Sequence, residues 1–230
     1  MSKSNFLDES SGYNKLISYY EKYQNKPFDY WLEFDKTLKP GKQGIVGLLN
    51  LKKKSGSSEE LQYIFKFSQY INYLIQHEGV VMKGLREISN FCPNFCKYVG
   101  TIICKVDPKS KKEGDPFNPE AKYPIEKEVL LCELIEKSTK FYNYIKADDR
   151  IKEDILYSTI KQVLLAIAIA QRKKNFTHYD LHSNNIMMKK CNKDLVFLYI
   201  LDEYNQFVVP SFGHYPVIID FGFSYIDDLN

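Results

Sequence analysis

The sequence lacks the features that mark several large protein classes. Its longest apolar run, Val163 to Ala170, is far too short to span a bilayer, so no membrane segment is predicted. The N-terminus MSKSNFLDES is polar and has no apolar stretch, which argues against a secretory signal. The net charge is only +3, with both signs mixed, and this bias is too weak to indicate nucleic acid as a partner.

Cysteine gives no sign of a disulfide framework or of a zinc site. There are five cysteines, an odd number. Cys92 and Cys96 are spaced as CxxxC, which fits no common zinc pattern, and no second pair follows. Free thiols in a reducing compartment are therefore predicted, and with them a cytoplasmic protein.

The composition is that of a folded chain with a substantial core. Of the 230 residues, 44% are hydrophobic and 15% are aromatic, which excludes a disordered protein and allows one domain or a two-lobed one. Periodicity predicts strands in the first half and a long helix later, an order that suggests two unlike lobes. The predicted elements are a helical region in 1–35, strand–glycine turn–strand over 38–54, a strand at 61–68, a helix at about 70–89, strands at 97–106 and 128–135, and a helix at about 151–173.

Two further segments carry structural predictions. The stretch from Asp107 to Pro124 holds prolines, glycine and charges, and is predicted to be a mobile surface loop. The segment 190–215 alternates as "LVFLYIL…FVVP", which predicts an extended β-hairpin with its turn at 202–206. Such a hairpin could thicken the surface of its lobe or serve as a docking edge, with Pro210 limiting edge pairing.

Polar side chains are concentrated in "THYDLHSNNIMM", from Thr177 to Met188. Asp180 and Asn185 stand five positions apart directly after the apolar helix. Asp220 opens "DFG" immediately after the apolar strand "PVIID", which brings a charge to the edge of the core. That placement suits a divalent cation better than it suits packing.

Four residues earlier in the chain fit phosphate chemistry, although each also has an ordinary structural explanation. Gly41 and Gly44 lie between strand-like runs, where glycine lets backbone N–H groups approach phosphate oxygens; an ordinary hairpin is the alternative. Lys66 lies between two phenylalanines on a strand and should point to the opposite face, where it could simply meet water. Glu78, on the following helix, could equally be a solvated side chain.

Taken in order, these motifs resemble the protein kinase superfamily: glycine loop, strand lysine, helix glutamate, hinge, loop Asp with Asn, then DFG. The resemblance runs from about Leu38 to the C-terminus. "HYDLHSNNI" is similar to the kinase catalytic loop, "IIDFGFS" to the metal-binding segment, "CPNFCKYVG" to the turn after the glutamate helix, and "LLCELI" to the strand end and hinge. Among kinases, the chain looks most like the Ser/Thr kinase-like proteins of large nucleocytoplasmic DNA viruses, which would place it in the host cytoplasm or the virion.

The resemblance implies an α+β, protein-kinase-like two-lobed fold, with a β-rich N-lobe and a helical C-lobe cut short after the DFG segment. It divides the chain into an N-terminal helical extension (1–35), an N-lobe through the hinge (36–135), and a partial C-lobe with the catalytic loop, the hairpin insert and DFG (136–230). Only eight residues follow Gly222, where a complete kinase has an activation segment and more helices. A fragment and a naturally truncated protein both remain open.

The resemblance also implies an ATP site in the N-lobe. Gly41 and Gly44 would cover the ATP phosphates, although Lys39 replaces the usual first glycine. Lys66 would hold the α- and β-phosphates and be oriented by Glu78, with Glu87 as the fallback. The hinge, Glu133 to Ile135 after the gatekeeper Cys132, would pair with adenine.

In the C-lobe, the resemblance assigns roles to five residues. Asp180 would accept the proton of the attacking hydroxyl. Asn185 and Asp220 would hold Mg²⁺, and His178 would tie the loop to the DFG region. His182 stands where Ser/Thr kinases have a lysine that contacts the γ-phosphate; histidine there resembles aminoglycoside and choline phosphotransferases.

The leading prediction is an ATP-dependent Ser/Thr protein kinase with a protein substrate. A small-molecule phosphotransferase and a truncated, non-catalytic kinase-like binding protein are the alternatives. Tyr179 replaces the usual arginine, which argues against control through a phosphorylated activation loop.

Overall fold

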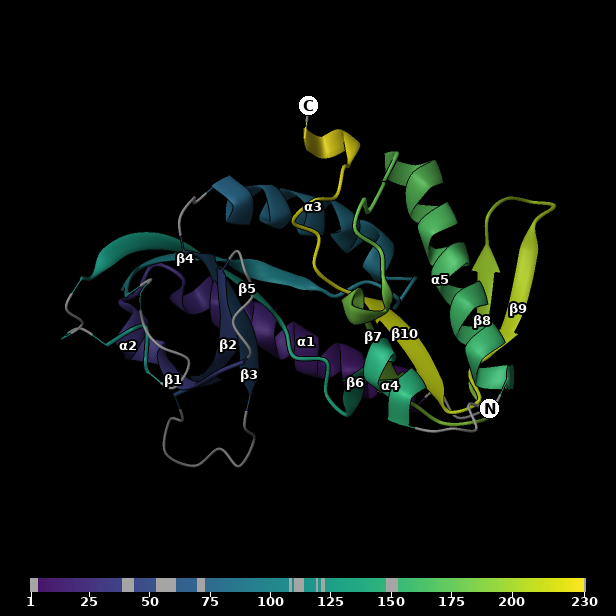
Figure 1. Ribbon diagram of the computed structural model, residues 1–230, viewed down its shortest axis with the longest axis horizontal. Helices are drawn as coiled ribbons and strands as arrows, with labels where there is room; N and C mark the ends of the chain where they lie inside the picture. Colours follow the sequence, from purple (N-terminus) through teal and green to yellow (C-terminus); the bar gives the residue numbers. More distant parts are fainter. Residues whose placement is uncertain are drawn as a thin grey trace. The chain divides into compact units, whose positions relative to one another are not determined.

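The computed structural model describes residues 4–38, 44–52, 61–69, 73–107, 109, 114–118, 120, 123–147 and 153–229, with side chains from residue 12 onward. The chain forms two compact units, which Figure 1 shows as ribbons. The first is Met1–Gly79 with Tyr98–Leu134, and the second is Val80–Lys97 with Ile135–Asn230. Within the described residues, every helix is too short or too polar to cross a bilayer. The protein is of the mixed α+β class, with mostly antiparallel strands.

The first unit is built on a five-stranded antiparallel sheet in the order β1-β2-β3-β5-β4. The strands predicted at 61–68, 97–106 and 128–135 are confirmed. The first strand starts earlier than predicted, because Leu32 and Phe34 turn inward in alternation. The elements are α1 (Ser4–Tyr23), α2 (Phe28–Trp31), β1 (Leu32–Thr37), β2 (Gly44–Leu51), β3 (Gln62–Ser68), β4 (Tyr98–Val106) and β5 (Ile125–Glu133).

Helix α1 is held against β4 by tyrosine hydroxyls. The Tyr20 hydroxyl donates to the Thr101 carbonyl at 2.9 Å, and the Tyr13 hydroxyl donates to the Tyr98 carbonyl. The ring of Tyr20 occupies the space where a β-carbon on Gly100 would stand. Glycine at position 100 is therefore required for the close approach of helix and strand.

The core of the first unit is aromatic and includes a residue from the loop predicted to be mobile. Phe65 and Phe67 on β3 are fully buried. Phe117, from the loop between β4 and β5, stacks on Phe28 with ring centroids 4.3 Å apart and meets Phe65 edge-on at 5.0 Å. The Asp115 carboxylate accepts from the Phe117 N–H at 2.8 Å and fixes this turn. The prediction of a loop lying only on the surface was therefore wrong for this part, because the large apolar ring of Phe117 is buried.

Helix α3 (Tyr73–Ser89) contributes its first residues to the first unit and its remainder to the second. The second unit contains a three-stranded sheet in the order β10-β7-β6 and the long helix α5. Its elements are β6 (Ser138–Lys140), α4 (Phe141–Ala147), α5 (Glu153–Lys174), η1 (Ser183–Asn185), β7 (Ile186–Lys190), β8 (Val196–Ile200), β9 (Gln206–Pro210), β10 (His214–Ile218) and η2 (Asp227–Leu229).

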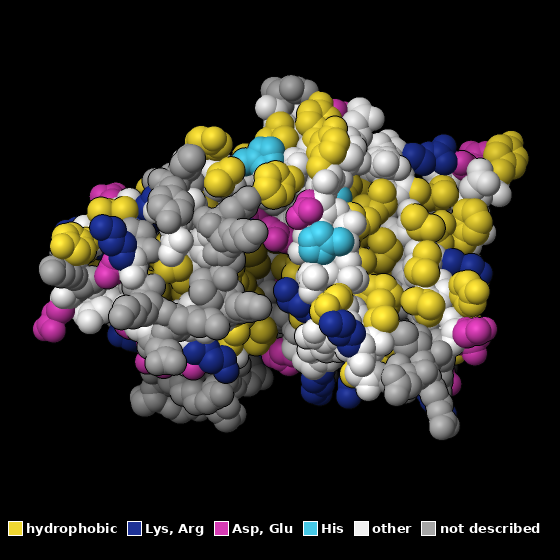
Figure 2. Space-filling view, in the orientation of Figure 1, with side chains coloured by type: hydrophobic (Ala, Val, Ile, Leu, Met, Phe, Trp, Pro, Cys, Tyr) yellow, Lys and Arg dark blue, Asp and Glu magenta, His cyan; other side chains and the backbone are white. Residues whose placement is uncertain are grey.

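Helix α5 is confirmed, but it is buried on one side only. Val163 is 7% exposed, whereas the neighbouring Leu164 is 62% exposed. Figure 2 shows hydrophobic side chains gathered over α5 and the adjoining hairpin, at the right of the view. The middle of the helix is apolar nearly all round, a pattern that favours deep burial. The structure instead packs one face and leaves the other open.

The predicted hairpin insert is present. Strands β8 and β9 pair antiparallel, with Leu198 opposite Val208, and they lie beside α5. The turn is organised by Asp202, whose carboxylate accepts from the backbone N–H of Tyr204 at 2.9 Å and of Asn205 at 2.8 Å. This local capping explains why the turn falls where the sequence placed it.

Candidate active site

Lys66 and Glu78 form an ion pair within the first unit. Lys66 Nζ lies 2.6 Å from Glu78 Oε2, and the two side chains are 21% and 5% exposed. The alternation of β3 turns Lys66 away from the buried Phe65 and Phe67, as predicted. The fallback Glu87 instead lies with its Oε2 3.3 Å from Lys174 Nζ. Glu78 is thus the partner of Lys66, and the ion pair between them holds α3 to β3.

The predicted glycine turn is only partly described. Gly44 is the first residue of β2 and stands opposite Ser68, so it belongs to the strand and not to the turn, contrary to the prediction. Its α-carbon approaches the Phe67 carbonyl so closely that a β-carbon would overlap it. Gly41 and Lys39 lie outside the described residues.

The predicted hinge residues lie where the first sheet ends. Cys132 is buried within β5, and Glu133 is the last residue of that strand, opposite Tyr63. Ile135 lies two residues further and belongs to the second unit, where its carbonyl accepts from Ser138 Oγ at 2.5 Å. The backbone leaves the sheet at this point, as the hinge prediction requires.

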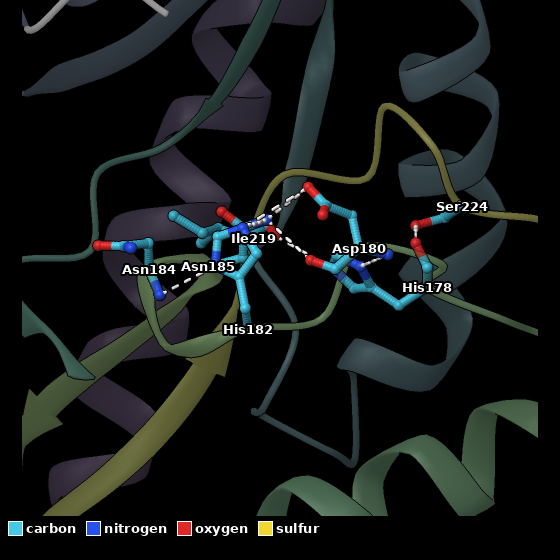
Figure 3. Close-up of polar contacts among 7 residues, drawn as sticks. All are labelled: His178, Asp180, His182, Asn184, Asn185, Ile219 and Ser224. Carbon is cyan, nitrogen blue, oxygen red and sulfur yellow. Dashed lines mark hydrogen bonds and ion pairs between the residues drawn. The ribbon is translucent and has the colours of Figure 1, made fainter. Parts of the chain in front are cut away.

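The second unit brings Asp180 and Asn185 together (Figure 3). Asn185 Nδ2 donates to the Asp180 backbone carbonyl at 3.0 Å and lies 3.3 Å from Asp180 Oδ2. The Asn185 backbone carbonyl accepts from the Ile219 N–H at 3.0 Å. Because the donor end of the Asn185 amide faces Asp180, its oxygen is directed away from that residue. The backbone hydrogen bond between Asn185 and Ile219 joins the "NN" motif to the segment that carries Asp220.

His178 makes the structural link that was predicted for it. Its Nε2 lies 3.2 Å from the Ile219 carbonyl, and its own carbonyl accepts from Ser224 Oγ at 3.2 Å. Burial lowers the pKa of His178, and the hydrogen bond to the Ile219 carbonyl opposes that shift. Neutral imidazole with its proton on Nε2 satisfies this geometry, since a carbonyl can only accept.

His182 is part of the same cluster, but it also has a local role that was not predicted. Its Nδ1 accepts from the Asn184 N–H at 3.2 Å, which caps the short helix η1. With Nδ1 accepting, the neutral ring carries its proton on Nε2, which lies 3.7 Å from Asp180 Oδ2. A polar residue directly before a short helical turn, accepting from the N–H two positions on, is the sequence signal for such a cap.

Two residues of this cluster have left-handed backbone conformations. Tyr179 has φ 58° and Asp220 has φ 65°, in a backbone region that residues other than glycine rarely occupy. Asp220 is exposed, while the next residue, Phe221, is fully buried among aromatic rings including Phe95 and Phe176. The buried ring fixes the backbone that presents Asp220, and strain of this kind is concentrated at functional sites.

The donor set of the described residues is limited. No three His, Cys, Asp or Glu side chains among them are grouped so as to hold a metal ion. Asn185 and Asp220 offer oxygen atoms only, which suits a hard cation such as Mg²⁺ that keeps water or phosphate oxygens as its other ligands. The donor types are thus suited to a hard cation, and the binding of one at these residues stays a prediction.

Comparison with known proteins finds similarity to viral sequences. It is 30% identical over 216 residues to the uncharacterized protein 038R of Invertebrate iridescent virus 3, an alignment that covers 80% of this chain and 39% of that protein. It is 31% identical over 210 residues to the uncharacterized protein 098R of Invertebrate iridescent virus 6, covering 76% and 35%. The chain thus spans well under half the length of these relatives.

A shorter similarity concerns activity. Over 63 residues the chain is 36% identical to the probable kinase 098L of Invertebrate iridescent virus 3, covering 27% of this chain and 11% of that protein. A scan against models of known protein families finds no match. The comparisons thus show similarity to iridescent virus proteins, and the similarity to a probable kinase covers one short segment of the chain.

Proposed function

We propose that the protein is an ATP-dependent phosphotransferase of the protein-kinase type, with the first unit as its N-lobe and the second as its C-lobe. The observation that supports this most is the ion pair between Lys66 Nζ and Glu78 Oε2 at 2.6 Å. Moving a lysine and a glutamate largely out of water costs free energy, which the pairing of their opposite charges offsets. A lysine oriented on a strand by a helix glutamate is suited to binding the phosphates of ATP.

The polar cluster of the second unit supplies the remaining chemistry of the proposal. The Asp180 carboxylate would accept the proton of the attacking hydroxyl, and Asn185 holds it through the amide nitrogen. Asn185 and Asp220 would hold Mg²⁺, which would supply charge neutralisation at the phosphates. Phosphoryl transfer needs mainly positioning and charge stabilisation, so this small set of residues is sufficient in kind.

The proposed acceptor is a Ser or Thr hydroxyl of a protein. His182 favours one other candidate, a phosphotransferase acting on a small alcohol, because its imidazole stands beside Asp180 where Ser/Thr kinases have lysine. A nucleotide-binding protein without transfer activity is the outcome to be expected if ATP binds but no phosphate leaves it.

Nucleotide binding is tested by thermal unfolding with ATP, with and without Mg²⁺. We expect the wild type to be stabilised by ATP with Mg²⁺ well beyond ATP alone, because bound ligand stabilises the folded state by mass action. Asp220→Asn should lose that Mg²⁺-dependent increment. Asp194→Asn, the same change on an exposed loop residue, should keep it. Equal shifts in wild type and Asp220→Asn would refute the metal role.

A further inference from the structure

The second unit contains a buried polar cluster that the proposed function does not use. It joins the turn after α3, helix α5 and the hairpin insert. Each member is at most 4% exposed, so each polar atom needs a partner inside the protein. The members are Cys92, Asn94, Ser158, Gln162 and Tyr199.

Tyr199, on strand β8 of the insert, is the donor at the centre of this cluster. Its hydroxyl lies 2.8 Å from Asn94 Oδ1 and 3.2 Å from Gln162 Oε1. A hydroxyl has a single proton, and the shorter distance assigns it to Asn94. Burial raises the pKa of Tyr199, so the hydroxyl stays protonated and remains a donor.

Asn94 is also fixed by its other polar groups. Its Nδ2 donates to the Pro216 carbonyl at 2.8 Å, and its backbone carbonyl accepts from the Ile218 N–H at 2.7 Å. The Cys96 N–H in turn donates to the Ile218 carbonyl at 3.0 Å. Both the side chain and the backbone of Asn94 therefore bind the end of β10.

The end of β10 leads directly into the candidate active site. Ile219, the next residue, donates its N–H to the Asn185 carbonyl and offers its own carbonyl to His178. Asp220 follows, in its left-handed conformation. A continuous series of hydrogen bonds thus leads from the insert, through Asn94, to the backbone that presents Asp220.

We propose that Tyr199 is a positioning residue, and that the hairpin insert uses its hydroxyl to hold Asn94 and, through it, the strand end that carries Asp220. The insert is then a built-in support of the site rather than a surface addition. The consequence for metal-dependent nucleotide binding rests on the proposed function, whereas the consequence for the backbone does not. Two independent measurements separate these claims.

The first measurement is amide hydrogen exchange. Tyr199→Phe removes one oxygen atom and leaves Asn94 Oδ1 with only the Cys92 thiol, a weak donor 3.4 Å away. We expect exchange at the Ile218 and Ile219 amides to become roughly tenfold faster, the scale of one hydrogen bond, while amides at the β9 end of the hairpin change less. Tyr204→Phe is the matched control, since it makes the same change in the same hairpin at a side chain that is 92% exposed. Exchange at Ile218 that is unchanged by Tyr199→Phe would overturn the proposal.

A second variant separates positioning from general loosening of the core. Gln162→Met removes the weaker acceptor, which also lies 3.5 Å from Asn94 Nδ2. It leaves in place the shorter bonds of Asn94 to Tyr199 and to the Pro216 carbonyl. We expect it to lower thermal stability and still leave Ile218 exchange close to that of the wild type. If Gln162→Met instead speeds exchange at Ile218 in proportion to its loss of stability, the cluster only stabilises the core and Tyr199 has no positioning role. This outcome can be read even if Tyr199→Phe does not fold.

The second measurement is the Mg²⁺ dependence of ATP binding, by calorimetry. We expect Tyr199→Phe to weaken the apparent Mg²⁺ affinity severalfold, with ATP binding in the absence of Mg²⁺ unchanged, and Tyr204→Phe to match the wild type. A wild type that shows no Mg²⁺-dependent binding would refute the proposed function and leave the exchange result to decide the role of Tyr199. Wild-type Mg²⁺ affinity in Tyr199→Phe would refute its positioning role at the metal site.

Discussion

Lys66 Nζ and Glu78 Oε2 lie 2.6 Å apart, one on β3 and the other on α3. The two residues are only twelve positions apart in the sequence, so the strand leads almost directly into the helix that supplies its partner. Glu78 is the more deeply placed of the two, at 5% exposure against 21%. Its carboxylate therefore depends on the lysine for charge compensation more than the lysine depends on it.

Glu78→Gln should destabilise the fold, although the charge that it leaves behind is the more exposed of the two. The variant removes the carboxylate that pairs with Lys66 Nζ, and we expect a loss of about 2–3 kcal/mol, below the range for fully buried pairs because Lys66 reaches water. Chemical denaturation measures it. Glu87→Gln is the control, because that carboxylate is 79% exposed and should cost less than about 1 kcal/mol. Equal losses in the two variants would contradict the structural importance of the pair.

Much of the architecture followed from local pattern. The alternation in "LVFLYIL…FVVP" predicted the hairpin and its turn, because the burial of Phe197, Tyr199 and Val209 has the period of a strand and the Asp202 turn is capped locally. The pairing of Lys66 with Glu78 followed from the resemblance to kinases, and strand alternation alone could give only the direction of the lysine.

Contacts between distant segments could not be predicted in this way. Phe117 stacks on Phe28, which lies 89 positions earlier in the sequence, and nothing in its polar loop signals that partner. The Tyr199–Asn94 bond joins residues 105 positions apart. Periodicity reports which face of an element is buried and not which element covers it, so tertiary partners of this kind remain invisible in a single sequence.

Gly100→Ala should separate α1 from β4. The new β-carbon would overlap the ring of Tyr20, which donates its hydroxyl to Thr101 in the same strand. We expect a loss of about 1–3 kcal/mol and faster proteolysis within α1. Gly79→Ala is the control, since its nearest neighbours are 3.8 Å or more away and alanine favours a helix; it should be neutral or stabilising. Retention of α1 by Gly100→Ala at wild-type stability would show that the helix adjusts.

His214→Phe should change the pH dependence of stability. Burial and the neighbouring Lys190 lower the pKa of His214, and its Nδ1 is buried without a hydrogen-bond partner in the described structure. The unfolded chain takes up a proton near pH 6.5 while the folded chain resists it, so this histidine costs stability as the pH falls through that value. Phenylalanine has no such cost.

The measurement is chemical denaturation of wild type and His214→Phe at pH 8, 6.5 and 5. We expect the variant to gain on the wild type as the pH falls, with most of the gain below pH 6.5. His178 also has a lowered pKa, but it is present in both proteins and cancels in the difference. A difference that stays constant from pH 8 to pH 5 would show that His214 titrates alike in the folded and unfolded states.

His182 has two possible roles, and its two ring nitrogens separate them. Nδ1 caps η1 by accepting from the Asn184 N–H, and Nε2 lies 3.7 Å from Asp180 Oδ2 on the side of the proposed reaction. His182→Asn keeps an acceptor for the cap and has no donor at the position of Nε2. His182→Lys supplies a donor and has no acceptor for the cap. The two substitutions therefore remove opposite halves of the residue.

If Nε2 contacts the transferred phosphate, the donor matters and the cap does not. We then expect His182→Lys to retain activity, and His182→Asn and His182→Ala each to lose on the order of one to two decades in transfer rate, the scale of a single transition-state donor. The assay is phosphate transfer from ATP to a generic protein substrate and to a panel of small alcohols. Full activity in His182→Asn together with loss in His182→Lys would make the histidine a cap for η1, because only the acceptor would then be needed. Because the wild type is assayed on the protein substrate and on the small alcohols, the acceptor that it prefers also identifies the substrate class.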